Sequence, residues 1–139
     1  MFRSTVPSWV SWLLVFVTAF GISLAARAER NPFGAIGIGA NRSSYVGACP
    51  VNIVYTANIN LNYPHPAGLE FNYYWVRSDG AKGPVTVVRP SPGQRMVIVR
   101  EPWRLGAAGQ HYDISETLFV NSGNTHLQQA SQVVSVTCK

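Results

Sequence analysis

Three histidines are the residues best suited to bind a metal ion or to act as a general base. They are His65, His111 and His126, and the turn signals around them place each in or beside a loop. None has a second histidine, a cysteine or a carboxylate at the spacing of a metal-binding motif. We therefore expect solvent-facing histidines, no metal and no cofactor, with a zinc site assembled from distant loops as the alternative.

Nucleophilic or carboxylate catalysis would need further partners. His111 and Asp113 are close in sequence and serines are plentiful, but no serine sits in a Gly-x-Ser-x-Gly turn, so a Ser-His-Asp triad has little local support. A glycosidase needs two facing carboxylates. The acidic residues are Glu29, Glu70, Asp79, Glu101, Asp113 and Glu116. Asp79 fits a turn and Glu70 the outer side of a strand, so we expect the protein not to be an enzyme.

The N-terminal residues 1–28 are predicted to be a signal peptide. Arg3 supplies a positive charge, an apolar run extends from Trp12 to Ala25, and Ala26-Arg27-Ala28 fits the cleavage rule. Cleavage would leave a secreted or periplasmic chain that begins at Glu29. The alternative is an uncleaved membrane anchor, because the apolar run approaches the length that spans a bilayer. Nothing later in the chain is apolar for long enough to span.

Two cysteines, Cys49 and Cys138, remain in a chain that we expect to be exported. In an oxidising compartment an even cysteine count favours a disulfide. The alternative, a reactive cysteine with a low-pKa thiolate, needs a nearby base or cation and usually no second thiol. The sequence therefore predicts a disulfide between these two residues.

The net charge is modestly basic, formally +5 for the whole chain. The arginines and lysines after residue 28 are scattered singly and form no run. A nucleic-acid-binding surface needs a continuous basic track. We therefore expect an ordinary solubilising surface and no nucleic-acid partner.

The chain after Gly47 alternates apolar and polar residues, as half-buried strands do. One face of the first long strand comprises Cys49, Val51, Ile53, Tyr55, Ala57, Ile59 and Leu61. Leu69, Phe71, Tyr73 and Trp75 share a face of the next, which ends at the turn Ser78-Asp79-Gly80. The further predicted strands are 85–89, 95–101, 112–120 and 128–138. Because six alternating strands return the chain to its starting end, Cys49 and Cys138 can meet.

The segment before these strands is rich in glycine, asparagine and serine. We predict a linker over residues 29–44, with at most one short strand near Ser44 to Val46, and one domain over residues 45–139. The glycines at 34, 37 and 39 resemble a phosphate-binding loop only superficially, since no Gly-Lys-Ser/Thr ends the segment. Short strands separated by turn signals favour an antiparallel sandwich or barrel.

Three motifs resemble a group of secreted bacterial immunoglobulin-like domains. They are Tyr45-x-Gly47-x-Cys49-Pro50, Tyr73-x-Trp75-x-x-Ser78-Asp79-Gly80 and Val136-x-Cys138. The resemblance implies an all-β immunoglobulin-like sandwich of about six to seven strands, with one disulfide joining the first long strand to the last. It implies no activity. In antibody domains the tryptophan follows the first cysteine sooner and a tyrosine stands where this chain has Val136, so antibody-like partners do not follow.

The residues predicted to recognise a partner are Tyr74, Arg77, Trp103 and Arg104. The alternation that buries Tyr73 and Trp75 turns Tyr74 outward, whereas Arg77 is in phase with the core and should emerge at the strand's end. Tyrosine, tryptophan and arginine are enriched at binding hot spots, so these four could form a patch for a protein partner. Alternatively, Tyr74 covers a neighbouring strand and Trp103 closes one end of the sandwich.

The sequence thus favours an exported, non-catalytic binding or structural module with a protein partner in the cell envelope or outside the cell. A first alternative is a carbohydrate or envelope-polymer-binding module, in which Tyr74 would stack on a sugar. A second is a secreted enzyme inhibitor that presents the loop around Pro64-His65-Pro66 to a protease.

Overall fold

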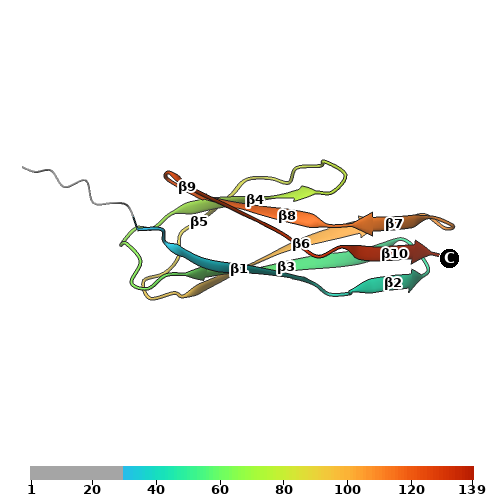
Figure 1. The fold of residues 1–139 in the computed structure, drawn as a ribbon, viewed down its shortest axis with the longest axis horizontal. Helices are drawn as coiled ribbons and strands as arrows, with labels where there is room; N and C mark the ends of the chain where they lie inside the picture. Colours follow the sequence, from blue (N-terminus) through green and yellow to red (C-terminus); the bar gives the residue numbers. More distant parts are fainter. Residues whose placement is uncertain (1–29) are drawn as a thin grey trace, which may run out of the picture.

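Residues 30–139 are described by a computed structural model, and every regular element within them is a β-strand (Figure 1). The predicted signal peptide lies outside the described residues. The all-β prediction is confirmed. The strands are β1 Phe33–Ala40, β2 Ser44–Gly47, β3 Val51–Leu61, β4 Phe71–Arg77, β5 Thr86–Val88, β6 Met96–Leu105, β7 His111–Ile114, β8 Glu116–Ser122, β9 Thr125–Ala130 and β10 Val134–Cys138.

The strands form three sheets that pack as a β-sandwich. The sheets have the strand orders β1-β3-β6, β5-β4-β8-β9 and β2-β10-β7. Only Ser115 separates β7 from β8, and residues 131–133 separate β9 from β10. The second and third sheets therefore follow one another along the molecule and together face the first (Figure 1).

The core follows the predicted alternation. Every second residue of β3, from Val51 to Leu61, is buried, while its neighbours are half-buried or exposed. Phe71 and Trp75 of β4 are buried, and Tyr73 packs against the core from a half-buried position. Burial of one face of each strand in this way is the main favourable contribution to folding.

The six strands predicted after Gly47 all exist, but the last two are each broken. Where β8 begins, Glu116 N–H donates a hydrogen bond to Ser131 Oγ (3.0 Å). On the neighbouring side Ser78 N–H donates to the Ser115 carbonyl (2.9 Å), and Ser115 N–H to Ser78 Oγ (3.1 Å). Serine hydroxyls thus replace part of the regular ladder, and both strands are interrupted at the same level.

The predicted linker over residues 29–44 is wrong for residues 33–40, which form β1. This strand pairs antiparallel with β3, with Ile38 opposite Ala57. Ile36 and Ile38 alternate with exposed glycines and pack against the core, so the strand has the period of two despite its glycines. The short strand predicted near Ser44 is confirmed as β2, and it pairs in parallel with β10. The sandwich is therefore not wholly antiparallel.

The predicted disulfide between Cys49 and Cys138 is present, with their Cα atoms 5.4 Å apart. Cys49 directly precedes Pro50 and β3, and Cys138 ends β10. The bridge therefore links two sheets at one end of the sandwich. Gly106 lies against it at φ +107°, where an added Cβ would stand 2.6 Å from Cys138 Sγ.

Within residues 30–139 no helix is long and apolar enough to cross a membrane.

Candidate functional site

The four residues predicted to form one recognition patch do not come together. The Arg77 guanidinium lies 4.9 Å from the centroid of the Trp103 ring, so these two do meet. Trp103 is only 7% exposed, however, and closes the sandwich between β6 and the opposite layer. Arg104 projects from the outward face of β6, and Tyr74 from the outward face of β4. The predicted patch is therefore wrong as a single surface.

Tyr74 is occupied by neighbours on its own sheet. It lies opposite Phe119 of β8, and the two rings stack with centroids 4.9 Å apart. The Lys82 ammonium lies 4.1 Å from the centroid of the same ring. These two side chains leave little of the Tyr74 ring for a ligand. Tyr74 therefore covers the neighbouring strand β8, as the alternative interpretation of the sequence expected.

Arg77 ends β4 on its core face, as its phase in the strand predicted. The guanidinium lies between two carboxylates, 3.7 Å from Glu101 Oε1 and 3.8 Å from Glu116 Oε1. The Glu116 side chain is 0% exposed. Within residues 30–139 neither of its carboxylate oxygens has a hydrogen-bond partner, nor does the buried Trp75 Nε1. Such unpaired buried atoms are rare in proteins and costly to bury.

The surroundings of Glu116 favour its neutral form. Burial raises the pKa of Glu116 to about 7, and the negative charges of Glu101 and Asp79 add to this increase, while Arg77 opposes it. Burial, followed by the charge of Glu116, raises the pKa of Tyr55 to about 12. Glu116 is fully enclosed, whereas Arg77 and Glu101 are partly exposed, so the two carboxylates share an arginine at the boundary of the core.

A groove with a volume of about 500 Å³ opens beside this buried cluster. Trp103 and Leu105 of β6 form one side, and Tyr112 and Ile114 of β7 the other. The turn residues Ser78 and Asp79 close one end. β6 and β7 are the terminal strands of their sheets, so the groove lies between two sheet edges.

The outer edge of β7 pairs with no other strand among residues 30–139. Cys138 N–H donates to the Gln110 carbonyl (2.9 Å), and hydrogen-bonded pairs alternate along an antiparallel ladder. Tyr112 and Ile114 therefore point their backbone groups at β10, whereas His111 and Asp113 point theirs at the open edge. The edge ends at Ser115, whose backbone groups are bonded to Ser78.

The open edge of β6 is protected against strand pairing. Leu61 N–H donates to the Arg95 carbonyl, and the β3–β6 register then directs the backbone groups of Arg100, Pro102 and Arg104 outward. Pro102 has no N–H to donate, and exposed charges such as Arg100 and Arg104 discourage pairing with another chain. Protection of the β6 edge thus explains the exposed position of Arg104 without a binding partner.

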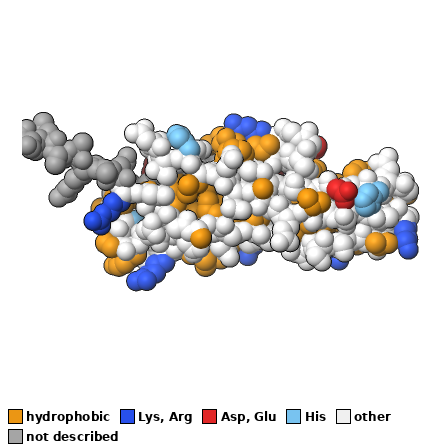
Figure 2. Space-filling view, viewed as in Figure 1, with side chains coloured by type: hydrophobic (Ala, Val, Ile, Leu, Met, Phe, Trp, Pro, Cys, Tyr) orange, Lys and Arg blue, Asp and Glu red, His pale blue; other side chains and the backbone are white. Residues whose placement is uncertain are grey.

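The outward face of β7 carries His111 and Asp113, the histidine and aspartate of a possible catalytic triad. His111 Nε2 lies 3.3 Å from Asp113 Oδ1, and Figure 2 shows a histidine beside an acidic side chain at this end of the molecule. Ser135 Oγ donates to Asp113 (2.6 Å), a bond that lowers the pKa of Asp113. The serine thus bonds to the aspartate and not to the histidine, which is not the arrangement of a triad.

The other histidines bond to protein atoms. His126 Nδ1 lies 2.7 Å from Asn121 Oδ1, and His65 Nε2 lies 3.2 Å from the Gln94 carbonyl oxygen. No group of three potential metal ligands occurs within residues 30–139.

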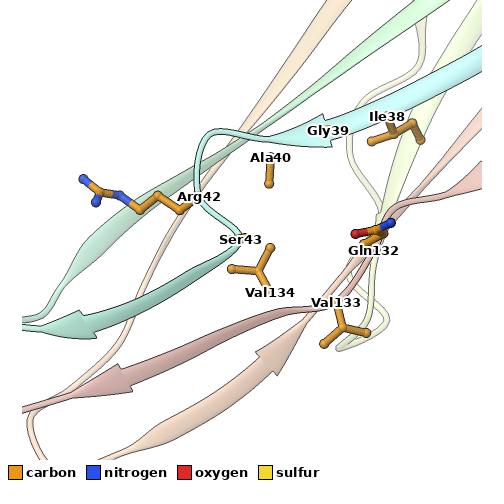
Figure 3. A pocket seen from close by; sticks show the side chains of 8 residues that line it. All are labelled: Ile38, Gly39, Ala40, Arg42, Ser43, Gln132, Val133 and Val134. Carbon is orange, nitrogen blue, oxygen red and sulfur yellow. The ribbon is translucent and has the colours of Figure 1, made fainter.

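A hollow of about 250 Å³ lies where the chain passes from β1 to β2, beside the break between β9 and β10. Ala40 and Val134 point into it, whereas Arg42 points away (Figure 3). The Arg42 guanidinium instead lies 5.2 Å from the centroid of the Tyr45 ring. Ser43 and Gln132 also line the hollow, so its walls combine small, aliphatic and polar side chains.

Comparison with models of known protein families finds no match to this chain. Comparison with curated proteins finds no significant match either.

Proposed function

We propose that the protein is an exported, non-catalytic binding module that engages a protein partner through the open edge of β7. The observation that carries this proposal is the position of that edge beside the groove lined by Trp103 and Leu105. An extended peptide can add to such an edge by main-chain hydrogen bonds, while pockets beside the edge select its alternate side chains.

The edge offers the partner two residues, His111 and Asp113, whose backbone N–H and C=O groups pair with no other strand among residues 30–139. The groove offers apolar surface from Leu105, a small further contribution from the largely buried Trp103, and a carboxylate from Asp79. A partner segment with an apolar side chain toward the groove and a basic one toward Asp79 would suit this arrangement. β7 is short, so the groove must supply much of the affinity.

The compartment is part of the same proposal. The disulfide between Cys49 and Cys138 suits an oxidising environment such as the periplasm or the extracellular space. The predicted signal peptide would deliver the chain there. Stacking of a sugar on Tyr74 receives no support, since Phe119 and Lys82 occupy that ring.

A proline placed on the open edge tests the proposal. Asp113→Pro removes an N–H that faces away from β10, so the native ladder should survive while the edge loses a donor. Asp113→Ala is the matched control, because it removes the same carboxylate and keeps the N–H. Peptides selected from a displayed random library on the exported wild-type protein would serve as probes.

We expect the selected peptides to bind the wild type and Asp113→Ala with similar affinity. Binding to Asp113→Pro should be at least tenfold weaker, which corresponds to the loss of about one hydrogen bond between uncharged groups. Amide exchange at His111 and Asp113 should slow when peptide binds. Equal binding by both variants, or protection of other amides alone, would show that the β7 edge is not the site. Thermal unfolding of each variant checks that the fold is retained.

A further inference from the structure

The end of the sandwich opposite the disulfide is formed by two proline-rich loops, residues 62–70 and 89–95 (Figure 1). The first contains Pro64 and Pro66, and the second contains Pro90 and Pro92. We call these two loops the proline tip. Proline fixes one backbone angle, so a surface built from these residues loses little conformational entropy when it binds a ligand.

Hydrogen bonds hold the two loops against each other and against the N-terminal segment. His65 Nε2 bonds to the Gln94 carbonyl oxygen (3.2 Å), which joins the loops. Asn62 Nδ2 donates to the carbonyls of Asn31 (3.0 Å) and Phe33 (2.9 Å). Gln94 Nε2 donates to the Met96 carbonyl (3.0 Å). The proline tip is therefore a preformed surface.

Tyr63 is the exposed aromatic ring of the proline tip, with 57% of its surface accessible. The Arg95 guanidinium lies 4.8 Å from the centroid of this ring and holds it in place. Two shallow grooves, of about 310 and 280 Å³, flank the ring and share Tyr63, Pro64, His65 and Pro66. In contrast to Tyr74, Tyr63 thus presents a ring surface with open space beside it.

The proline tip is also cationic. Arg30 lines one of the grooves, and Arg95 lies over the Tyr63 ring. Among residues 30–139, no carboxylate lines either groove. The nearest paired charges along the two loops, Arg89 and Glu70, neutralise each other at 2.7 Å. Basic and hydrophobic side chains gather at this end of the molecule in Figure 2.

We propose that the proline tip binds an acidic sugar, a pyranose that carries a carboxylate. The apolar face of the pyranose would stack on the Tyr63 ring, whose negative face attracts the polarised C–H groups of a sugar. Its carboxylate would pair with Arg30 or Arg95. A hydroxyl would donate to Asn62 Oδ1, since Asn62 Nδ2 and the ring nitrogens of His65 already face carbonyl oxygens within the tip. Shallow grooves around a single aromatic ring fit one pyranose chair, whose C–H groups form an apolar face, better than they fit a lipid surface, which would require a row of long apolar side chains.

Calorimetric titration of the exported protein with a galacturonic acid pentasaccharide tests this site. Maltopentaose is the neutral control, and inorganic phosphate controls for charge alone. We expect binding of the acidic pentasaccharide only. Tyr63→Ala should weaken it about tenfold or more through loss of stacking, and Tyr63→Phe should retain most of it.

The charge is tested by a matched pair of cation substitutions. Arg95→Ala removes the cation over Tyr63, and Lys82→Ala removes the equivalent cation over Tyr74 on another face. We expect a loss of about fivefold or more for Arg95→Ala and none for Lys82→Ala. An equal loss in both variants would mean non-specific attraction and would overturn the site.

Equal binding of maltopentaose, or no binding of either pentasaccharide, would also overturn it. Binding to phosphatidylglycerol vesicles without binding to the pentasaccharide would reassign the proline tip to a membrane surface. The outcome is independent of the β7 edge, because Asp113→Pro should leave binding of the acidic sugar unchanged.

Discussion

Replacement of Glu116 by glutamine should make the protein more stable at neutral and alkaline pH. Glutamine keeps the shape of the side chain and removes its ionisation. Glu116 faces Arg77 from β4, Glu101 from β6, Asp79 from the adjoining turn and Tyr55 from β3. Two of these groups are anions and one is a cation, so the site does not compensate a buried negative charge.

The size of the effect follows from proton linkage. The folded protein holds the pKa of Glu116 at about 7, whereas the unfolded chain titrates near 4.5. Because the folded-state pKa is the higher one, the folded protein binds the extra proton. The contribution of Glu116 protonation to the free energy of unfolding is therefore fully present below pH 4.5 and is lost as pH rises through 7. A shift of this size corresponds to about 3 kcal/mol, a large share of a typical domain's total.

Urea unfolding of wild type and Glu116→Gln at pH 4.5 and pH 8 measures this difference directly. We expect the two proteins to differ little at pH 4.5 and the variant to be more stable at pH 8 by up to about 3 kcal/mol. Glu70→Gln, which removes an exposed carboxylate paired with Arg89, should change stability by less than about 1 kcal/mol at either pH. If wild type and Glu116→Gln differ in stability by the same amount at both pH values, Glu116 does not titrate between them with a raised pKa. If Glu116→Gln is less stable than wild type at pH 8, the ionised pair between Glu116 and Arg77 stabilises the fold.

Three other perturbations have defined outcomes. Arg77→Met removes the cation beside Glu116 that lowers the pKa of this carboxyl group. In pH-dependent urea unfolding we therefore expect the loss of stability to extend above pH 7, and an unchanged profile would contradict this. Gly106→Ala would place an alanine at φ +107° and its Cβ 2.6 Å from Cys138 Sγ. Thermal unfolding should therefore show that the variant is less stable by about 1–3 kcal/mol, whereas unchanged stability would mean that the disulfide can shift. Reduction of the disulfide, which joins residues 89 positions apart, should lower the urea midpoint by the equivalent of about 4 kcal/mol, and an unchanged midpoint would show that the unfolded chain is already constrained.

Most strands could be predicted from the sequence because each buries one face. The alternation in β3 and the phase of Trp75 report this burial directly. β1 was missed because two of its three exposed positions, Gly37 and Gly39, are glycines, which signal a loop when no neighbouring strand is known. The break at Ser115 was missed for another reason: it depends on hydrogen bonds that the backbone N–H groups of Ser115 and Glu116 donate to Ser78 Oγ and Ser131 Oγ, which are distant in sequence.

The cluster of Arg77, Glu101 and Glu116 could be predicted only in part from the sequence. Arg77 was predicted on the core face, and Glu116 has the same phase as Ile114 and Leu118, so each could be read as inward-facing. Their pairing depends on the β4–β8 register, which places Arg77 opposite Glu116 and which no local pattern reveals. Tyr63 was missed because loop residues have no periodicity from which exposure can be predicted.

The two proposed sites lie at opposite ends of the molecule, and this separation has a consequence. β3 extends from the disulfide end to the proline tip over 11 residues, a span of about 35 Å at the usual rise of a strand. Charges that far apart are screened from each other at physiological salt. An acidic sugar and a peptide should therefore bind without competition or coupling. A module with this arrangement would hold a protein partner close to an acidic polymer, because a chain bound at one end remains free to bind at the other.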